Sequence, residues 1–218
     1  MGEVVKMLTI ISRNAFILAV FAIVCTGAIA IVNVLSKPVI ELQEQKALLK
    51  TVNQLIPAQS YNNDLFASCF TVRDDALLGK GREQKVFLAK KDNQAMALML
   101  QASSFRGYAG EIKLAIGIYA NGQLAGVRVI RHTETPGLGD KIQSKKSDWI
   151  FAFNNKSYQP AQDKRWDVSK NGGDFDAFTG ATITPRAVIL AVKNALIYFE
   201  KNKETLFKHE ANCGEANE

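Results

Sequence analysis

The chain has 218 residues, of which 47% are hydrophobic and 22% are charged, a balance that is typical of a folded core and excludes a disordered chain. Its formal net charge is +6, but the lysines are scattered and form no long basic run, so we expect no nucleic-acid partner. The three cysteines lack metal-ligand spacing and the two histidines stand alone, so we expect no metal site.

An uncharged, apolar segment at residues 14–36 follows a short N-terminal tail at residues 1–13. About 20 residues are enough for a helix to cross the hydrocarbon core of a membrane. Arg13 and Lys37 flank the segment, where their side chains can reach the two membrane surfaces. A cleaved signal peptide is the alternative, but its apolar core is only about 7–15 residues long. The sequence therefore predicts a transmembrane helix at residues 14–36.

An amphipathic pattern follows and Pro57 ends it, which predicts a helical stalk at residues 37–57 and a folded domain at residues 58–218. Basic residues lie on both sides of the predicted span, so they do not decide its orientation, although large domains can be translocated regardless of charge. If the domain is exported, Cys69 and Cys213, near its two ends, could form a disulfide. The alternative is a pair of unpaired, buried thiols.

Alternating apolar residues predict a largely antiparallel sheet in this domain. The clearest hairpin has apolar residues at every second position from Ile112 to Ile118, a predicted type I′ turn at Asn121-Gly122, and a return strand. An apolar stripe at residues 188–199 has helical spacing and predicts a C-terminal core helix. Strands combined with terminal helices favour an α+β fold. The predicted strands are residues 68–73, 86–90, 95–102, 112–118 and 124–131, with residues 91–94 as a hairpin loop.

The stretch at residues 174–186 comes directly before the predicted C-terminal helix. Thr184 followed by Pro185 predicts the helix start, with the threonine as the cap of the first backbone N–H groups. Thr179 and Thr182 then present hydroxyls near a helix N-terminus, where an anion such as a phosphate is stabilised. An ordinary capped loop before a surface helix is the alternative.

A second loop rich in small residues, HTETPGLG at residues 132–139, follows a predicted strand and could also bind a phosphate-bearing ligand through its backbone N–H groups. The sequence has no Ser/His/Asp arrangement with a nucleophile turn, no Walker loop, and no GxGxxG between a strand and a helix. We therefore expect no catalytic residues. The two small-residue loops are the candidate ligand site.

Three motifs, in this order, resemble the FMN-binding domain family of membrane redox complexes. They are Gly107-Tyr108-x-Gly110, ETPGLG at residues 134–139, and Asp176-x-x-Thr179-Gly180-Ala181-Thr182-x-Thr184. The family includes the G subunit of the Rnf (Rsx) electron transport complex and the C subunit of the sodium-translocating NADH:quinone reductase. The resemblance covers essentially the whole chain, and the short length and the cysteines make it more similar to the Rnf G subunits.

The resemblance implies an FMN that a separate flavin transferase joins covalently, through the phosphate, to the hydroxyl of Thr182. Thr179 and Pro185 stand where the family often has serine. Thr179 keeps the hydroxyl and Pro185 suits a helix start, so attachment is still expected at Thr182. The other residues that are expected at the cofactor are Thr179, Gly180, Ala181, Thr184, Glu134, Thr135, Leu138, Gly139 and Lys141.

The implied function is that of a membrane-anchored electron-transfer subunit of an ion-translocating oxidoreductase, without independent catalysis. Its implied partners are the membrane itself and the other membrane and peripheral subunits of an Rnf-type complex. Its implied location is the bacterial inner membrane, with the FMN domain on the periplasmic side. Two alternatives remain: the C subunit of a sodium-translocating NADH:quinone reductase, and a membrane-anchored module that binds a phosphorylated ligand without redox chemistry.

Overall fold

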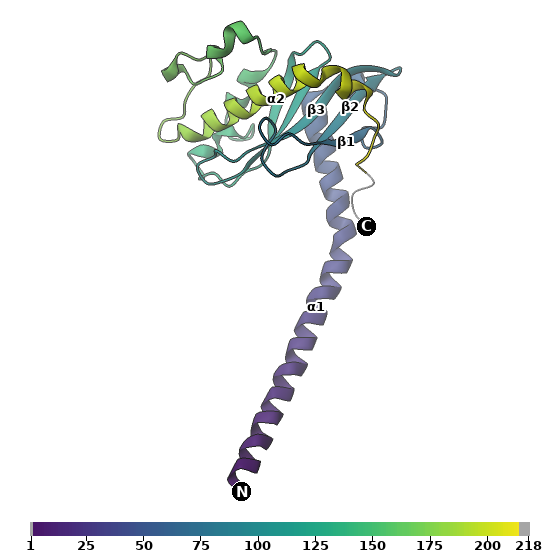
Figure 1. The fold of residues 1–218 in the computed structure, drawn as a ribbon, viewed down its shortest axis with the longest axis vertical. Coiled ribbons are helices and arrows are strands. Elements are labelled where there is room, and N and C mark those ends of the chain that lie inside the picture. Colours follow the sequence, from purple (N-terminus) through teal and green to yellow (C-terminus); the bar gives the residue numbers. More distant parts are fainter. Residues whose placement is uncertain (1, 214–218) are drawn as a thin grey trace. The chain divides into compact units, whose positions relative to one another are not determined.

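A computed structural model of the chain describes residues 2–213, except for the side chains of residues 2–12, 38–42, 44–45 and 161–163. The described residues form two compact units that divide between Leu49 and Lys50. The first unit contains most of helix α1, Gly2–Leu55, while the second contains five strands and helix α2, Ile183–Lys208 (Figure 1). The binding loops that the sequence predicts all belong to the second unit.

Helix α1 is continuous through the predicted membrane segment and the predicted stalk. Within it, the stretch Arg13–Lys37 is long and apolar enough to cross a membrane, and none of its most apolar window is buried inside the protein. These bounds agree with the predicted span to within one residue at each end. A helix that is apolar all round is unfavourable in water, so this stretch needs an apolar environment.

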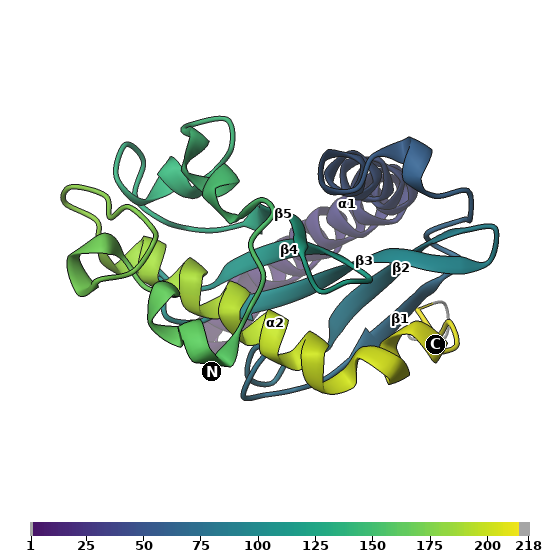
Figure 2. The same cartoon turned by 90° about the horizontal axis from the view of Figure 1, so that it is seen from above.

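The second unit is built on an antiparallel sheet in which sequence neighbours pair, in the order β1-β2-β3-β4-β5. Helix α2 lies across one face of this sheet (Figure 2). The α+β class that the sequence predicts is therefore confirmed. The strands are β1 Cys69–Val72, β2 Gln84–Lys91, β3 Gln94–Ser104, β4 Ile112–Tyr119 and β5 Leu124–Arg131.

The core lies between the sheet and α2. Alternate residues of β4, from Ile112 to Ile118, are fully buried and face the predicted apolar stripe of α2, which is also buried. Burial of each large aliphatic side chain contributes about 1.5–3 kcal/mol. The opposite face of the sheet is covered in part by the end of α1, because a Cβ atom added at Gly117 would lie 3.1 Å from the Cβ of Leu55. The glycine lets the helix end approach the sheet.

The turn between β4 and β5 differs from the predicted type I′ turn. A type I′ turn needs positive φ at both central residues, but φ is positive at Gly122 and not at Asn121. The N–H of Gly122 donates to the carbonyl of Tyr119 at 2.8 Å, so Gly122 follows the turn as a left-handed residue. The two-residue turn with positive φ occurs instead between β2 and β3, at Asp92 (51°) and Asn93 (62°), residue types that tolerate this conformation.

A disulfide joins Cys69 in β1 to Cys213, over a sequence separation of 144 residues. The N–H of Cys213 donates to the carbonyl of Cys69 at 3.2 Å, and the N–H of Thr71 donates to the side chain of Asn212 at 2.8 Å. The segment after α2 therefore lies beside the first strand. Cys25 in α1 is an exposed, free thiol.

Candidate functional site

Three segments that are distant in sequence form a cavity of about 320 Å³, which is near the lower limit of small-molecule sites. They are the turn at residues 107–110, the loop at residues 132–139, and the turn that leads into α2. We call this the Thr182 cavity. Its lining residues are Tyr108, Glu134, Thr135, Leu138, Gly139, Gly180, Ala181, Thr182, Ile183 and Thr184.

The buried carboxylate of Glu134 holds these three segments together. Glu134 is only 4% exposed. Its Oε1 accepts a hydrogen bond from the N–H of Ala109 at 3.0 Å, and its Oε2 accepts one from the hydroxyl of Thr184. Among the described residues, no lysine or arginine forms an ion pair with this carboxylate. Hydrogen bonds must therefore offset the cost of removing the charge from water.

Two glycines make room for this carboxylate. A Cβ atom added at Gly107 would lie 2.7 Å from Oε1 of Glu134 and 2.4 Å from the carbonyl oxygen of Gly110. One added at Gly139 would lie 2.9 Å from the Cβ of Glu134 and 2.9 Å from the hydroxyl of Thr184. These distances are shorter than real Cβ contacts, so the glycines permit the close approach of the three segments.

Helix α2 begins earlier than the sequence predicts, and Thr184 does not cap it. The helix starts at Ile183 with Thr182 in the N-cap position, and the side chain of Thr182 makes no capping hydrogen bond. Thr184 is buried inside the first turn, where its hydroxyl donates to Glu134. The hydroxyl of Thr184, which was expected to cap the helix, therefore donates to the buried carboxylate of Glu134 instead. The first N–H groups of a helix have no partners within it, so positive partial charge remains beside Thr182.

Most of the predicted cofactor residues come together in this cavity, but Thr179 and Lys141 do not line it. Thr179 is exposed in the turn before α2, and Lys141 lies in the short 3₁₀ helix η2, Gly139–Ile142. Two lining residues, Tyr108 and Ile183, were not predicted as site residues. Tyr108 could have been predicted from the sequence, because it is an aromatic residue between the two glycines of the first motif. Ile183 lies off the apolar stripe of α2, which was the signal that it does not serve the core.

The chemistry of the cavity fits a phosphorylated ligand with an apolar part, such as FMN. Thr135 and Thr182 supply hydroxyls, while Gly139 and Gly180 leave the backbone accessible. The described lining residues include no lysine or arginine, so the attraction for a phosphate comes from the N-terminus of α2. Thr182 is partly exposed and lies at that N-terminus, so its hydroxyl can be reached from solution.

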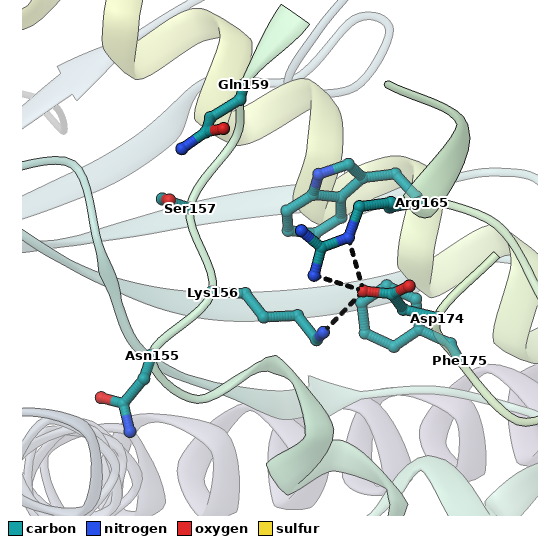
Figure 3. Close-up of a pocket in the computed structure, with 8 residues that line it drawn as sticks. Asn155, Lys156, Ser157, Gln159, Arg165, Asp174 and Phe175 are labelled. Atoms are coloured by element: carbon teal, nitrogen blue, oxygen red, sulfur yellow. Dashed lines mark hydrogen bonds and ion pairs between the residues drawn. The ribbon is translucent and has the colours of Figure 1, made fainter. Parts of the chain in front are cut away.

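A second cavity of about 170 Å³ lies in the same unit and is strongly polar (Figure 3). At its centre, Oδ2 of Asp174 accepts hydrogen bonds from Arg165 at 2.8 Å and from the ammonium of Lys156 at 3.0 Å. These two hydrogen bonds, with that of Arg165 the stronger, lower the pKa of Asp174 below its ordinary value. We call this the Asp174 cavity. Its other lining residues are Asn155, Ser157, Gln159, Trp166 and Phe175.

A cluster of aromatic rings leads from the Asp174 cavity toward the turn before Thr182. Phe175 packs against Trp166 with 5.6 Å between ring centroids and against Phe153 with 4.5 Å. Trp149 packs against Phe153 at 5.5 Å and against Phe178 at 5.2 Å. These distances are typical of favourable aromatic pairs. We call these five residues the aromatic cluster, and it fixes the segment that carries the third motif.

Comparison with known proteins agrees with the resemblance seen in the sequence. Residues 107–197 match the FMN-binding domain, and residues 7–55 match the RnfG N-terminal region. The G subunit of the ion-translocating oxidoreductase complex of Shewanella baltica is 45% identical over 205 residues, which cover 94% of this chain and 96% of that protein. The protein of the same name from Vibrio cholerae is 46% identical over 207 residues, which cover 95% of this chain and 99% of that protein. The chain therefore belongs to the family of G subunits of ion-translocating oxidoreductase complexes of the Rnf type.

Proposed function

We propose that this protein is the membrane-anchored electron-transfer subunit of an ion-translocating oxidoreductase complex, and that it carries FMN joined through its phosphate to Thr182. One observation carries the proposal: Thr182 lies at the N-terminus of α2 and lines a cavity formed by all three motifs of the FMN-binding domain. A phosphoester at this position is stabilised by the positive end of the helix. Its hydroxyl is also accessible to a second enzyme.

Attachment requires an activated flavin phosphate. In this proposal, Oγ1 of Thr182 would form a bond to the phosphorus of the activated flavin phosphate, the phosphorus–oxygen bond to the leaving phosphate would break, and the hydroxyl proton would pass to a base. The cavity supplies no lysine or arginine and no free base for this step among its described lining residues, which supports a separate flavin transferase as the catalyst. Once bound, FMN supplies reversible electron transfer, while the protein supplies position and electrostatics. The subunit then needs no catalytic residues of its own.

The test is the intact mass of the full-length protein, purified from its membrane and denatured in acid. We expect yellow protein with the added mass of one FMN less one water. Thr182→Ala should lose this mass completely, while Thr182→Ser keeps a hydroxyl and should retain it. Covalent flavin in the Thr182→Ala protein would overturn the assignment of the site. A phosphorylated ligand that is not a flavin would favour a binding module without redox chemistry.

The partners in this proposal are the flavin transferase and the other subunits of the complex. Expression in a host without a flavin transferase should give colourless, folded protein, and co-expression of the transferase should restore the flavin. The relatives are named as subunits of a larger complex. Affinity purification of this chain from its native membrane should therefore recover further membrane and peripheral redox subunits. Recovery of the chain alone under mild detergent conditions would contradict the proposal that it belongs to a larger complex.

We propose that Arg13–Lys37 spans the inner membrane and that the FMN domain lies on the periplasmic side. The disulfide between Cys69 and Cys213 supports export, because disulfides persist in oxidising compartments. Protease added to intact spheroplasts should digest the domain, and protection until lysis would reverse the orientation. Alkylation of unreduced protein should modify Cys25 alone. Modification of all three cysteines without reductant would show that the disulfide does not form in the cell.

A further inference from the structure

Four cationic side chains come together at one end of the sheet, where β2 and β4 begin and β3 and β5 end. Arg82 and Arg131 form ion pairs with Glu111, at 3.6 Å and 3.0 Å. Lys113 lies opposite Arg131 in the pairing of β4 with β5, and Lys85 is close enough to act on the charge of Lys113. We call Arg82, Lys85, Lys113 and Arg131 the basic surface.

The basic surface carries more positive charge than its surroundings neutralise. Within residues 2–213, the carboxylate that forms ion pairs with it is that of Glu111, which serves two arginines at once. Burial lowers the pKa of the partly buried Lys113, Glu111 opposes this effect, and the other three cations lower the pKa further. The nearby Glu83 interacts with Arg73 and is not among the charged groups that act on Lys113. Because like charges repel, the fold gains no stability from holding these four cations together.

The cations are accessible and lie beside exposed aromatic side chains. The side chains of Arg82 and Arg131 are 57% and 67% exposed, and Lys85 is exposed as well. The turn between β3 and β4 adds Phe105, which is 48% exposed, and Tyr108, which is 70% exposed. Arginine and aromatic side chains are enriched at protein–protein interfaces. The composition therefore fits an acidic protein surface better than lipid head groups, which need only positive charge.

The basic surface continues directly into the walls of the Thr182 cavity. The N–H of Ala109 donates to Glu134 at 3.0 Å, and Glu111 follows only two residues later. Consecutive Cα atoms are about 3.8 Å apart, so at most about 8 Å separates the Cα atoms of Ala109 and Glu111. At the end of β5, Arg131 comes three residues before Glu134. A protein that binds the basic surface would thus lie next to the cavity.

We propose that the basic surface is the docking site for an acidic patch on another subunit of the complex. This inference rests on the proposed membership of a larger complex and not on the attachment of flavin. Complementary charges speed the encounter of two proteins and orient them, and they exclude wrong partners. Docking between redox proteins often uses small interfaces, for which such charges are well suited.

The experiment is cross-linking by a water-soluble carbodiimide in native membranes that contain the full-length protein. Carbodiimide joins an amine to a carboxylate with which it is in direct contact, so mass spectrometry of the products identifies the pairs. We expect Lys85 to be joined to an aspartate or glutamate of another subunit. The yield should fall as the salt concentration is raised, because salt screens exposed charges.

Charge-neutralising variants test the basic surface as a whole. Arg82→Gln and Arg131→Gln each remove one charge but keep Lys85, so each should lower the yield of Lys85 cross-links several-fold. Lys91→Gln is the matched control, because Lys91 is exposed at the other end of β2 and its loss changes the net charge equally. Its yield should equal that of the wild type. Thermal unfolding verifies that the variants are folded.

The proposal is overturned if Lys85 is joined to no other subunit, or if the two arginine variants give the same yield as Lys91→Gln. Loss of bound acidic phospholipid from the arginine variants, with unchanged cross-linking, would assign the basic surface to lipid head groups and overturn it as well. Absence of other subunits from the affinity-purified wild type would instead refute the proposed membership of a complex. The two failures are therefore distinguishable.

Discussion

The Thr182 cavity and the Asp174 cavity lie in the same unit but satisfy their polar groups differently. In the Asp174 cavity, one carboxylate is paired with both Lys156 and Arg165, so the negative charge of Asp174 is neutralised within the protein. In the Thr182 cavity, the one charged lining residue is buried and hydrogen-bonded, while hydroxyls and apolar side chains face the opening. The more strongly charged cavity is thus not the better candidate site. Hydroxyls and apolar side chains that face the opening of a cavity therefore identify a ligand site better than charges that are already paired within the protein.

The largest expected effect is that of a substitution at Gly173, which precedes Asp174 in the chain. A Cβ atom at Gly173 would lie 1.9 Å from the carbonyl oxygen of Asp167, which is backbone and cannot move aside. Gly173→Ala should therefore lower the free energy of unfolding by about 3 kcal/mol or more. Gly172→Ala is the matched control, because a Cβ there meets nothing and only its positive φ costs energy, about 1–2 kcal/mol. Thermal unfolding of the two variants measures the difference, and equal losses would contradict the steric argument.

Removal of the central carboxylate should disrupt the Thr182 cavity. Glu134→Ala leaves the N–H of Ala109 and the hydroxyl of Thr184 without their acceptor, which should cost about 2–4 kcal/mol. Glu134→Gln can still accept from Ala109 and can donate to Thr184, so we expect a loss of only about 1 kcal/mol. Denaturant unfolding compares the two variants. A loss in Glu134→Gln as large as in Glu134→Ala would mean that the charge itself is required.

Gly139→Ala should have a smaller effect on stability but a clear effect on the site. The added methyl group would press on the side chains of Glu134 and Thr184, which can shift in part, so we expect a loss of about 1–3 kcal/mol. Flavin content should fall as well, because the cavity is displaced. Gly137→Ala meets no atom within 4 Å and serves as the control for flavin content, while its positive φ costs about 1–2 kcal/mol of stability. Full flavin content in Gly139→Ala would argue against the close approach as a requirement for attachment.

The smallest expected effect is that of Asp174→Asn, about 0.5–1 kcal/mol, because Arg165 is half exposed and solvent screens the pair. The lowered pKa of Asp174 sets the sign of the pH dependence. A carboxyl with a lowered folded-state pKa contributes stability above its ordinary pKa of about 3.9 and loses it as the pH falls through the folded value. The difference between wild type and variant should thus be constant from neutral pH to about 5 and should vanish in acid. A difference that grows in acid would exclude this ion pair as its source.

Local patterns predicted the strands and the C-terminal helix because alternation and helical spacing are properties of adjacent residues. The geometry of turns and helix caps was predicted less well, because it depends on contacts with residues that are distant in the sequence. The type I′ geometry belongs to Asp92 and Asn93, while Gly122 alone is left-handed in the other hairpin. Thr184 lost its expected capping role to a carboxylate 50 positions away in the sequence.

In the candidate site, too, features of short continuous segments were predicted, and features that depend on contacts between distant segments were not. Motifs identified most residues of the Thr182 cavity, because each motif is a short, continuous segment. Tyr108 and Ile183 were missed because their exposure follows from how three segments meet. The ion pairs of Asp174 were missed for the same reason, since Lys156, Arg165 and Asp174 lie in separate segments of the chain.

The aromatic cluster contains both tryptophans of the chain, Trp149 and Trp166. Tryptophan emits in the spectral range where oxidised flavin absorbs, so excitation energy should pass from the cluster to the flavin that we propose on Thr182. The protein thus has a built-in optical reporter: its ultraviolet emission should dim as each molecule acquires its flavin. Flavin attachment could then be followed in real time without a label, because both donor rings belong to the folded unit and lie outside the apolar stretch Arg13–Lys37.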